Sequence, residues 1–204
     1  MSAKLIYVMG PSGVGKDSLL NWLRSHVQAL QPKPALHFAR RTITRAAGDA
    51  TEDHEAIGPE DFAKLAQEGV FALHWQAHGL HYGVRRTELA DRSGWVIVNG
   101  SRAYVQEARS RCPGLTVLHV SAPEDLVRQR LLSRQREDAA EVEARVLRSQ
   151  SAAVDLADGD LHIVNAGSLE ESARTLCQLL QAHTGLHLVR PSQAFGLSSI
   201  SHTN

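Results

Sequence analysis

The stretch GPSGVGKD, Gly10 to Asp17, has the residue types and spacing of a loop that binds phosphate groups. In the motif G-x-x-x-x-G-K-[ST], consecutive backbone N–H groups surround a phosphate chain, and glycine permits unusual backbone angles and close approach. A strand-like run precedes the loop at residues 5–9 and a helical pattern follows it, as the motif requires. Lys16 is expected to reach the β- and γ-phosphates of a nucleotide. The residues expected to hold the nucleotide are Gly10, Pro11, Ser12, Gly13, Val14, Gly15, Lys16, Asp17 and Ser18.

Asp17 occupies the last motif position, where Ser or Thr normally ligates a magnesium ion. It has three interpretations: a decayed site, because a carboxylate repels a triphosphate; a residue favoured by the helix dipole; or a magnesium ligand, because carboxylate oxygens suit this hard cation. A decayed loop would sooner have lost Lys16 or its glycines. We therefore predict an active site in which Asp17 helps to place Mg²⁺, directly or through water.

The carboxylate that strand ends usually supply to such a metal is missing here. The run WVIVNGSR ends in Asn99, and LTVLHVSAP ends without an acid. We hypothesise that Asp17 supplies the charge from its own loop, while Asn99 bonds a metal-bound water.

Strand-like runs alternate with helical patterns along the chain. The strand-like runs are residues 5–9, 36–39, 95–98, 115–120 and 161–164. The segments with helical spacing are residues 17–30, 102–111, 123–133, 140–156 and 168–183, the last opening on a capping-box pattern of Ser168 and Glu171. This alternation predicts an α/β fold, a parallel sheet with helices on both faces.

Two segments interrupt the alternation. Residues 40–94 hold a short helix candidate at 59–67 and an aromatic run, and we interpret them as an inserted substrate-binding lobe. Residues of about 134–145 are charged and are interpreted as a short lid. We expect one kinase-sized domain over residues 1–184, followed by a flexible tail over residues 185–204.

Five motifs together carry a family resemblance. GPSGVGKDSLL, RTITR (41–45), EDHEAI (52–57), HGLHYGV (78–84) and VNGSRA (98–103) are similar to the ribose 1,5-bisphosphate phosphokinase family, within the guanylate kinase branch of nucleoside monophosphate kinases. The resemblance covers residues 3–184, and an aspartate follows the loop lysine in that family. It implies a three-layer P-loop kinase fold with a small inserted lobe and a lid.

The resemblance also implies a reaction. The γ-phosphate of ATP would pass to the 1-phosphate of ribose 1,5-bisphosphate, giving 5-phosphoribosyl 1-diphosphate (PRPP), a late step of phosphonate use through carbon–phosphorus lyase. The implied cofactors are ATP and Mg²⁺. The implied partner is a small phosphorylated sugar.

The sequence departs from guanylate kinases where those enzymes read guanine. Arg45 keeps the first arginine of their acceptor set and Tyr82 is retained, but the second arginine position falls near Gly48, the tyrosine on His54 and the glutamate near Leu73. A site without the polar groups that hydrogen-bond guanine loses its selectivity for guanine over other acceptors. The phosphate-binding side is thus expected to survive without the guanine-reading side.

A phosphate acceptor is already an anionic nucleophile, so no general base is required, and the site needs cations instead. We expect Lys16 on the donor, Arg41 and Arg45 on the acceptor, and Arg134 and Arg145 closing from the lid, because arginine grips phosphate bidentately. The other arginines of this region, Arg128, Arg130 and Arg148, are expected on a solvated helix face.

Several polar and aromatic residues receive narrower predictions. Asn165, after the last strand-like run, is expected next to the adenine of the nucleotide. His74, His78 and His81 have helical metal-ligand spacing, but Gly79 argues for hairpin packing. The remaining predictions are that His54 and His81 contact sugar hydroxyls or phosphate, that Asn99 and Tyr82 belong to the substrate site, and that Trp75 and Tyr82 are lobe core.

Two other functions stay open. One is a guanylate-like nucleoside monophosphate kinase, which the missing guanine contacts disfavour. The other is a non-catalytic guanylate-kinase-like interaction module, which the intact Gly13, Gly15 and Lys16 disfavour. A GTPase would need an N-K-x-D motif, which this sequence lacks.

Composition bounds the partners and the compartment. The 204 residues carry 22 basic and 22 acidic side chains, so no overall field recruits nucleic acid or an anionic membrane. Cys112 and Cys177 match no zinc or redox spacing, and no run reaches the length of a membrane span. We expect a cytoplasmic protein with no nucleic-acid or membrane partner. Its oligomeric state, monomer or homodimer, is left open.

Overall fold

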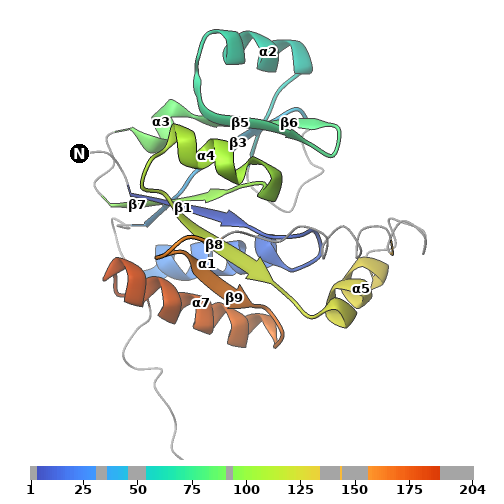
Figure 1. Ribbon diagram of the computed structural model, residues 1–204, viewed down its shortest axis with the longest axis vertical. Helices are drawn as coiled ribbons and strands as arrows, with labels where there is room; N and C mark the ends of the chain where they lie inside the picture. Colours follow the sequence, from blue (N-terminus) through green and yellow to red (C-terminus); the bar gives the residue numbers. More distant parts are fainter. Residues whose placement is uncertain are drawn as a thin grey trace, which may run out of the picture.

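The fold is built on a five-stranded parallel sheet (Figure 1). The computed structural model describes residues 4–30, 36–45, 54–90, 94–133, 143 and 156–188. The strands, in spatial order, are β2 (Leu36–Phe38), β7 (Trp95–Asn99), β1 (Lys4–Met9), β8 (Thr116–Ser121) and β9 (Leu161–Val164). Each matches one of the runs expected from the sequence. The sheet places the carboxyl ends of β1, β7 and β8 side by side, because they are hydrogen-bonded neighbours.

Helices cover both faces of this sheet, as predicted. Figure 1 shows α1 (Lys16–Leu30) and α7 (Leu169–Thr184) below the sheet and α4 (Val105–Arg111) above it. Alternate residues of β1 enter the two sides of the core. Ile6 and Val8 belong to the cluster that holds α1 and α7, and Tyr7 and Met9 to the cluster that holds α4.

Two further helical segments follow strand ends. The 3₁₀ turn η1 (Arg102–Tyr104) leads into α4, so the predicted helix at 102–111 has two parts, and α5 (Glu124–Ser133) follows β8. The capping box expected at the start of α7 is confirmed: the Ser168 side chain accepts from the Glu171 backbone N–H, and Glu171 accepts from the Ser168 backbone.

The inserted segment forms a lobe of its own above the sheet (Figure 1). Its four strands, in spatial order, are β4 (His54–Ala56), β3 (Arg41–Ile43), β6 (Leu80–Arg85) and β5 (Phe71–Ala77). The expected helix is α2 (Pro59–Gln67), and α3 (Arg86–Leu89) follows β6. β5 and β6 are an antiparallel hairpin turning at His78 (φ 51°) and Gly79 (φ 74°), the left-handed pair of a tight hairpin turn. The three histidines therefore lie on a hairpin and not on one helix face.

The lobe shares its core with the sheet. Trp75 and Tyr82 are buried, their rings stack at 5.6 Å, and they belong to the same cluster as Tyr7, Met9 and Val98. The prediction that Trp75 and Tyr82 are lobe core is thereby confirmed. This shared packing fixes β3 and β6 next to the ends of the sheet strands.

Some predictions fall outside the described residues. These are the lid at 134–145 apart from residue 143, the helix at 140–156 apart from residues 143 and 156, and the tail beyond residue 188. Within the described ranges, no helix has the length and apolarity needed to cross a membrane.

Candidate nucleotide and acceptor site

The phosphate loop lies between β1 and α1, and its glycines are needed for its shape. Gly13 (φ 85°) and Gly15 (φ 86°) have left-handed backbone angles that side chains disfavour. At Gly10 the reason is contact, because an added Cβ would lie 2.2 Å from the Val120 carbonyl oxygen on β8. The loop therefore has the form that its motif predicts, directed into the N-terminus of α1.

Hydrogen bonds to the Val14 carbonyl hold one side of the phosphate loop, called its back here. The buried Asn165 donates from Nδ2 to the Val14 carbonyl oxygen at 2.7 Å. Arg130 Nη1 lies 3.2 Å from the same oxygen and 3.3 Å from the Asn165 carbonyl oxygen. Asn165, expected next to adenine, thus lies against the loop itself.

Arg130 corrects one of the expectations. A solvated helix face was predicted for it, and this is wrong because its guanidinium reaches the loop. The neighbouring Arg128 is on the expected face, paired with Glu124 and Asp125. Arg130 lies three residues after the buried Val127, so helical spacing puts it near the packed side of α5. That spacing is the signal that could have found it.

The front of the loop joins Asp17 to the end of the neighbouring strand. Asn99, the last residue of β7, donates from Nδ2 to Asp17 Oδ1 at 2.9 Å. Lys16 Nζ lies 3.8 Å from the same Oδ1, with 17% of the Lys16 side chain and 48% of the Asp17 side chain exposed. The contact arises because β7 pairs with β1 and the Gly100 N–H donates to the Val8 carbonyl at 2.8 Å.

This arrangement has the chemistry that Mg²⁺ requires. Asp17 presents a half-exposed carboxylate, and an oxygen ligand of this kind suits the cation. Among the described residues, no group of three or more His, Cys, Asp and Glu side chains could hold a metal. Magnesium commonly uses one or two carboxylates together with substrate phosphates, so a single Asp17 fits that pattern.

Tyr7 fixes the turn that carries Asn99 into the site. Its hydroxyl donates to the Ser101 carbonyl at 3.0 Å and accepts from the Ser101 N–H at 2.8 Å. Burial raises the pKa of Tyr7 well above its usual range, so the hydroxyl stays protonated. Gly100 is required here, because a Cβ would lie 2.0 Å from the Tyr7 ring.

A cleft opens beside Asp17, between α1 and the ends of β2 and β7. The cleft is shallow: its enclosed volume is about 10 Å³, and the rest of the hollow is open to solvent. The lining residues are Asp17, Leu20, Asn21, Arg24, Phe38, Ala39, Ile97 and Asn99. Asn21 and Arg24 are cleft residues that no sequence motif predicted. Their positions four and seven residues after Asp17, on one helix face, are the signal that could have found them.

Three predicted acceptor residues come together at this edge. Arg41 Nη1 donates to the Asn99 carbonyl oxygen at 3.2 Å, and its guanidinium lies 5.1 Å from the centre of the Tyr82 ring. Arg45 follows β3 by two residues and is half-buried. The structure therefore gathers Arg41, Tyr82 and Asn99 beside the loop.

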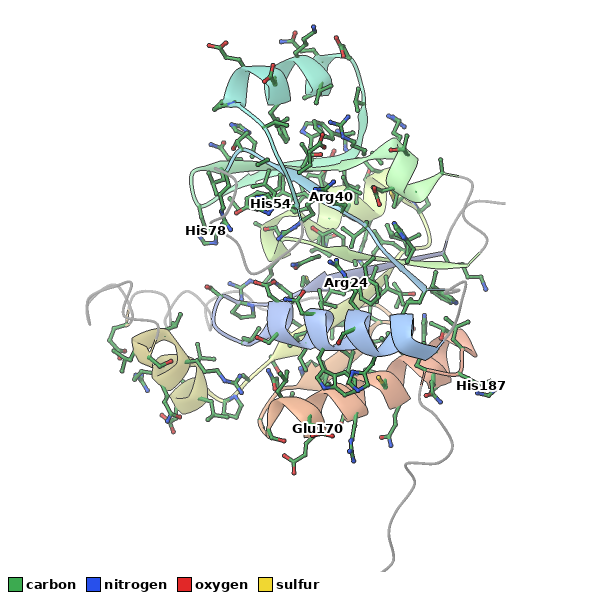
Figure 2. All side chains as sticks on the ribbon, turned by 180° about the vertical axis from the view of Figure 1, so that it is seen from behind. Arg24, Arg40, His54, His78, Glu170 and His187 are labelled. Atoms are coloured by element: carbon green, nitrogen blue, oxygen red, sulfur yellow. The ribbon has the colours of Figure 1, made fainter. Side chains whose placement is uncertain are left out.

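The two predicted histidines lie differently. His54 is paired with Arg41 across β3 and β4, and its carbonyl accepts from Arg40 Nη2 at 3.1 Å. Figure 2 shows Arg40 and His54 on the lobe, with Arg24 on the side of α1 that faces it. The His81 ring packs against Phe62 of α2 at 5.4 Å, on the opposite side of β6 from Tyr82. Arg134 and Arg145 lie outside the described residues.

Comparison with solved structures identifies the fold. A guanylate kinase from Anaplasma phagocytophilum superposes with a TM-score of 0.62 at 18% sequence identity, covering 92% of this chain and 89% of that one. The expected guanylate-kinase-like α/β fold is confirmed.

Comparison with curated sequences identifies the family, although no protein-family model matches the chain. A ribose 1,5-bisphosphate phosphokinase PhnN from Burkholderia mallei is 42% identical over 188 residues, 89% of this chain and 97% of that relative. A longer protein of the same name from Janthinobacterium is 41% identical over 182 residues, 88% of this chain and 39% of that relative. The chain belongs to the ribose 1,5-bisphosphate phosphokinase family.

Proposed function

We propose that the protein transfers the γ-phosphate of ATP to the 1-phosphate of ribose 1,5-bisphosphate, forming PRPP in phosphonate use. The observation that carries this proposal is the Asp17–Asn99 pair, placed where an intact phosphate loop opens onto a cleft. The names of the two relatives support the choice of acceptor.

The donor nucleotide is held by the loop amides, by the N-terminus of α1 and by Lys16. Asp17 would hold Mg²⁺, directly or through water, and the ion supplies charge neutralisation on the phosphates. Asn99 orients the Asp17 carboxylate through its amide. Asn165 and Arg130 hold the Val14 carbonyl by hydrogen bonds and so fix the loop, and we propose that Asn165 also lies next to the adenine.

The acceptor is held by cations, and no general base is needed. Arg41, fixed by the Asn99 carbonyl and by Tyr82, presents a guanidinium at the edge of the site, with Arg45 and His54 as further acceptor contacts. An oxygen of the 1-phosphate attacks the γ-phosphorus, and the bond to ADP breaks with its electron pair leaving on ADP. We propose that Arg134 and Arg145 stabilise the negative charge that develops in the transition state. We also propose that His81, whose ring packs against Phe62 of α2, stabilises the lobe.

The wider organisation is part of the same proposal. It comprises a kinase domain over residues 1–184, with the lobe at about 40–94, the lid at about 134–145 and a tail at 185–204. The first residues of that tail belong to the packed domain, because Leu188 is buried in the core, and the flexible part is proposed for the residues beyond it. We place the enzyme in the cytoplasm.

Phosphorus NMR tests the proposal directly. The purified protein is incubated with magnesium ATP and, in separate tubes, with ribose 1,5-bisphosphate and with GMP. A new diphosphate signal with the ribose compound alone is the expected result. Formation of GDP would instead indicate a nucleoside monophosphate kinase. ATP binding without either product would favour a non-catalytic module.

A further inference from the structure

Arg24 is a cation in the cleft that has no role in the proposed reaction. It lies seven residues after Asp17 on the same face of α1, about 10 Å along the helix axis at 1.5 Å per residue, and both line the cleft. Asp17 and Arg24 are the two charged residues of that lining. The two ends of the cleft therefore differ: one has the phosphate loop and the other has a guanidinium.

The guanidinium is held by an aromatic ring. Its central carbon lies 5.3 Å from the centre of the Phe38 ring, and Arg24 forms no hydrogen bond or ion pair within the part of the chain that the structure describes. Most other arginines of the described chain pair with a carboxylate or a carbonyl, as Arg41, Arg85 and Arg130 do. A half-buried arginine positioned over a ring keeps its donors available for a ligand, and its planar fork matches a phosphate.

A bisphosphate acceptor supplies two anions to one cleft. The phosphate that reacts must lie at the loop end, near Asp17 and Arg41. The sugar ring separates the second phosphate from it, which places that group toward the far end of the cleft. We propose that Arg24 binds this second phosphate, the 5-phosphate of ribose 1,5-bisphosphate. This inference rests on the proposed function.

Such a contact determines specificity. A nucleoside monophosphate carries a base, and not a second phosphate, at the end of the acceptor remote from the reacting group. A pocket with a cation at that end favours a sugar bisphosphate, since a site built around a polar partner discriminates strongly against analogues that lack it.

Single-phosphate probes separate the two ends. The wild type, Arg24→Met and Arg24→Lys are compared with Arg174→Met, an exposed arginine on α7 paired with Glu170. Methionine keeps an apolar stem on Phe38, and thermal unfolding verifies folding. KM and kcat are measured with ribose 1,5-bisphosphate, and calorimetry measures the binding of ribose 5-phosphate and ribose 1-phosphate.

The expected result is selective for the 5-phosphate. In Arg24→Met the KM for the bisphosphate and the Kd of ribose 5-phosphate rise about 10- to 100-fold, the value of one charged hydrogen-bonded contact. The kcat, the KM for ATP and the Kd of ribose 1-phosphate change little, Arg24→Lys recovers part of the loss, and Arg174→Met resembles the wild type.

Two outcomes for Arg24→Met overturn the inference. One is that the binding of ribose 1-phosphate and of ribose 5-phosphate weakens equally, and the other is that the binding of ribose 5-phosphate does not weaken. The calorimetric titrations need no turnover, so they decide the role of Arg24 independently. Absence of PRPP formation by the wild type contradicts the proposed function, and a non-selective Arg24→Met variant contradicts the Arg24 contact alone.

Discussion

The two sides of the phosphate loop are built in opposite ways. Behind it, the Val14 carbonyl is closed off by Asn165 and Arg130, and Asn165 is buried. In front, Asp17 lines a cleft and remains half-exposed beside Asn99, and Lys16 Nζ lies 3.8 Å from its carboxylate. The back fixes the shape of the loop through protein–protein hydrogen bonds. The front keeps the Asp17 carboxylate accessible, as a site that must exchange nucleotide and acceptor requires.

This comparison predicts a separation of effects. Changes at the front should reduce catalysis while leaving stability nearly intact. Changes at the back should lower the free energy of unfolding, and activity should fall only as a consequence of that loss of stability.

The largest effect is expected for Lys16→Met. Removing the loop cation should lower kcat/KM by at least about 10²–10³-fold, the cost of losing one group that stabilises transition-state charge. The unfolding midpoint in urea should stay close to that of the wild type. A coupled assay of ADP release measures kcat/KM. A loss of stability in proportion to the loss of activity would contradict the separation between the front and the back of the loop.

Next comes Asn99→Leu, which removes the amide that orients Asp17. We expect kcat/KM to fall about 10- to 100-fold, as for other residues that hold a metal ligand in place. The magnesium concentration for half-maximal rate should rise as well, because Asp17 then adopts several orientations. Magnesium titrations of the initial rate measure both. An unchanged magnesium requirement would show that the pair is only structural.

Asn165→Leu tests the back of the loop. It removes one of two hydrogen bonds to the Val14 carbonyl, and Arg130 keeps the other, so the cost is about 1 kcal/mol, the net value of one hydrogen bond. Asn165 Oδ1 is buried without a hydrogen-bond partner among the described residues, so leucine also removes an unfavourable group and the cost should not exceed this value. Urea denaturation measures the free energy of unfolding. Arg128→Met, at an exposed ion pair on α5, is the control and should change it by at most about 0.5 kcal/mol.

The smallest effect concerns pH. Burial lowers the pKa of His74 and of His119 below the usual 6.5. The unfolded chain therefore takes up protons at a higher pH than the folded chain. The contributions of His74 and His119 to the free energy of unfolding are thus fully present above pH 6.5 and decrease as the pH falls below it. Unfolding free energies at pH 7.5 and 5.5 measure the decrease. His119→Gln should make it shallower, and an identical slope would contradict this assignment.

Much of the frame could be predicted from the sequence, because the causes are local. The runs that became β1, β7 and β8, the helix after the loop and the Ser168 cap follow from periodicity and turn chemistry. The proximity of Asp17 and Asn99 also follows, since neighbouring parallel strands end at one edge of a sheet.

Other features depend on contacts that no local pattern encodes. The reach of Arg130 to Val14 depends on where α5 packs against the loop. The short strands β3 and β4 depend on pairing with β6, which also decides that His81 and Tyr82 lie on opposite sides of the lobe. Arg24 was visible as helical spacing, but only the fold places Phe38 beside it.

Asp17 decides whether the front of the loop is a working site. The most direct measurement is a phosphorus NMR time course with ATP and ribose 1,5-bisphosphate, recorded for the wild type and Asp17→Asn over a range of magnesium concentrations. We predict a diphosphate product from the wild type and a rate lower by about 10²-fold in the variant, whose neutral amide is a poorer ligand for a hard cation. Equal rates at every magnesium concentration would contradict the account.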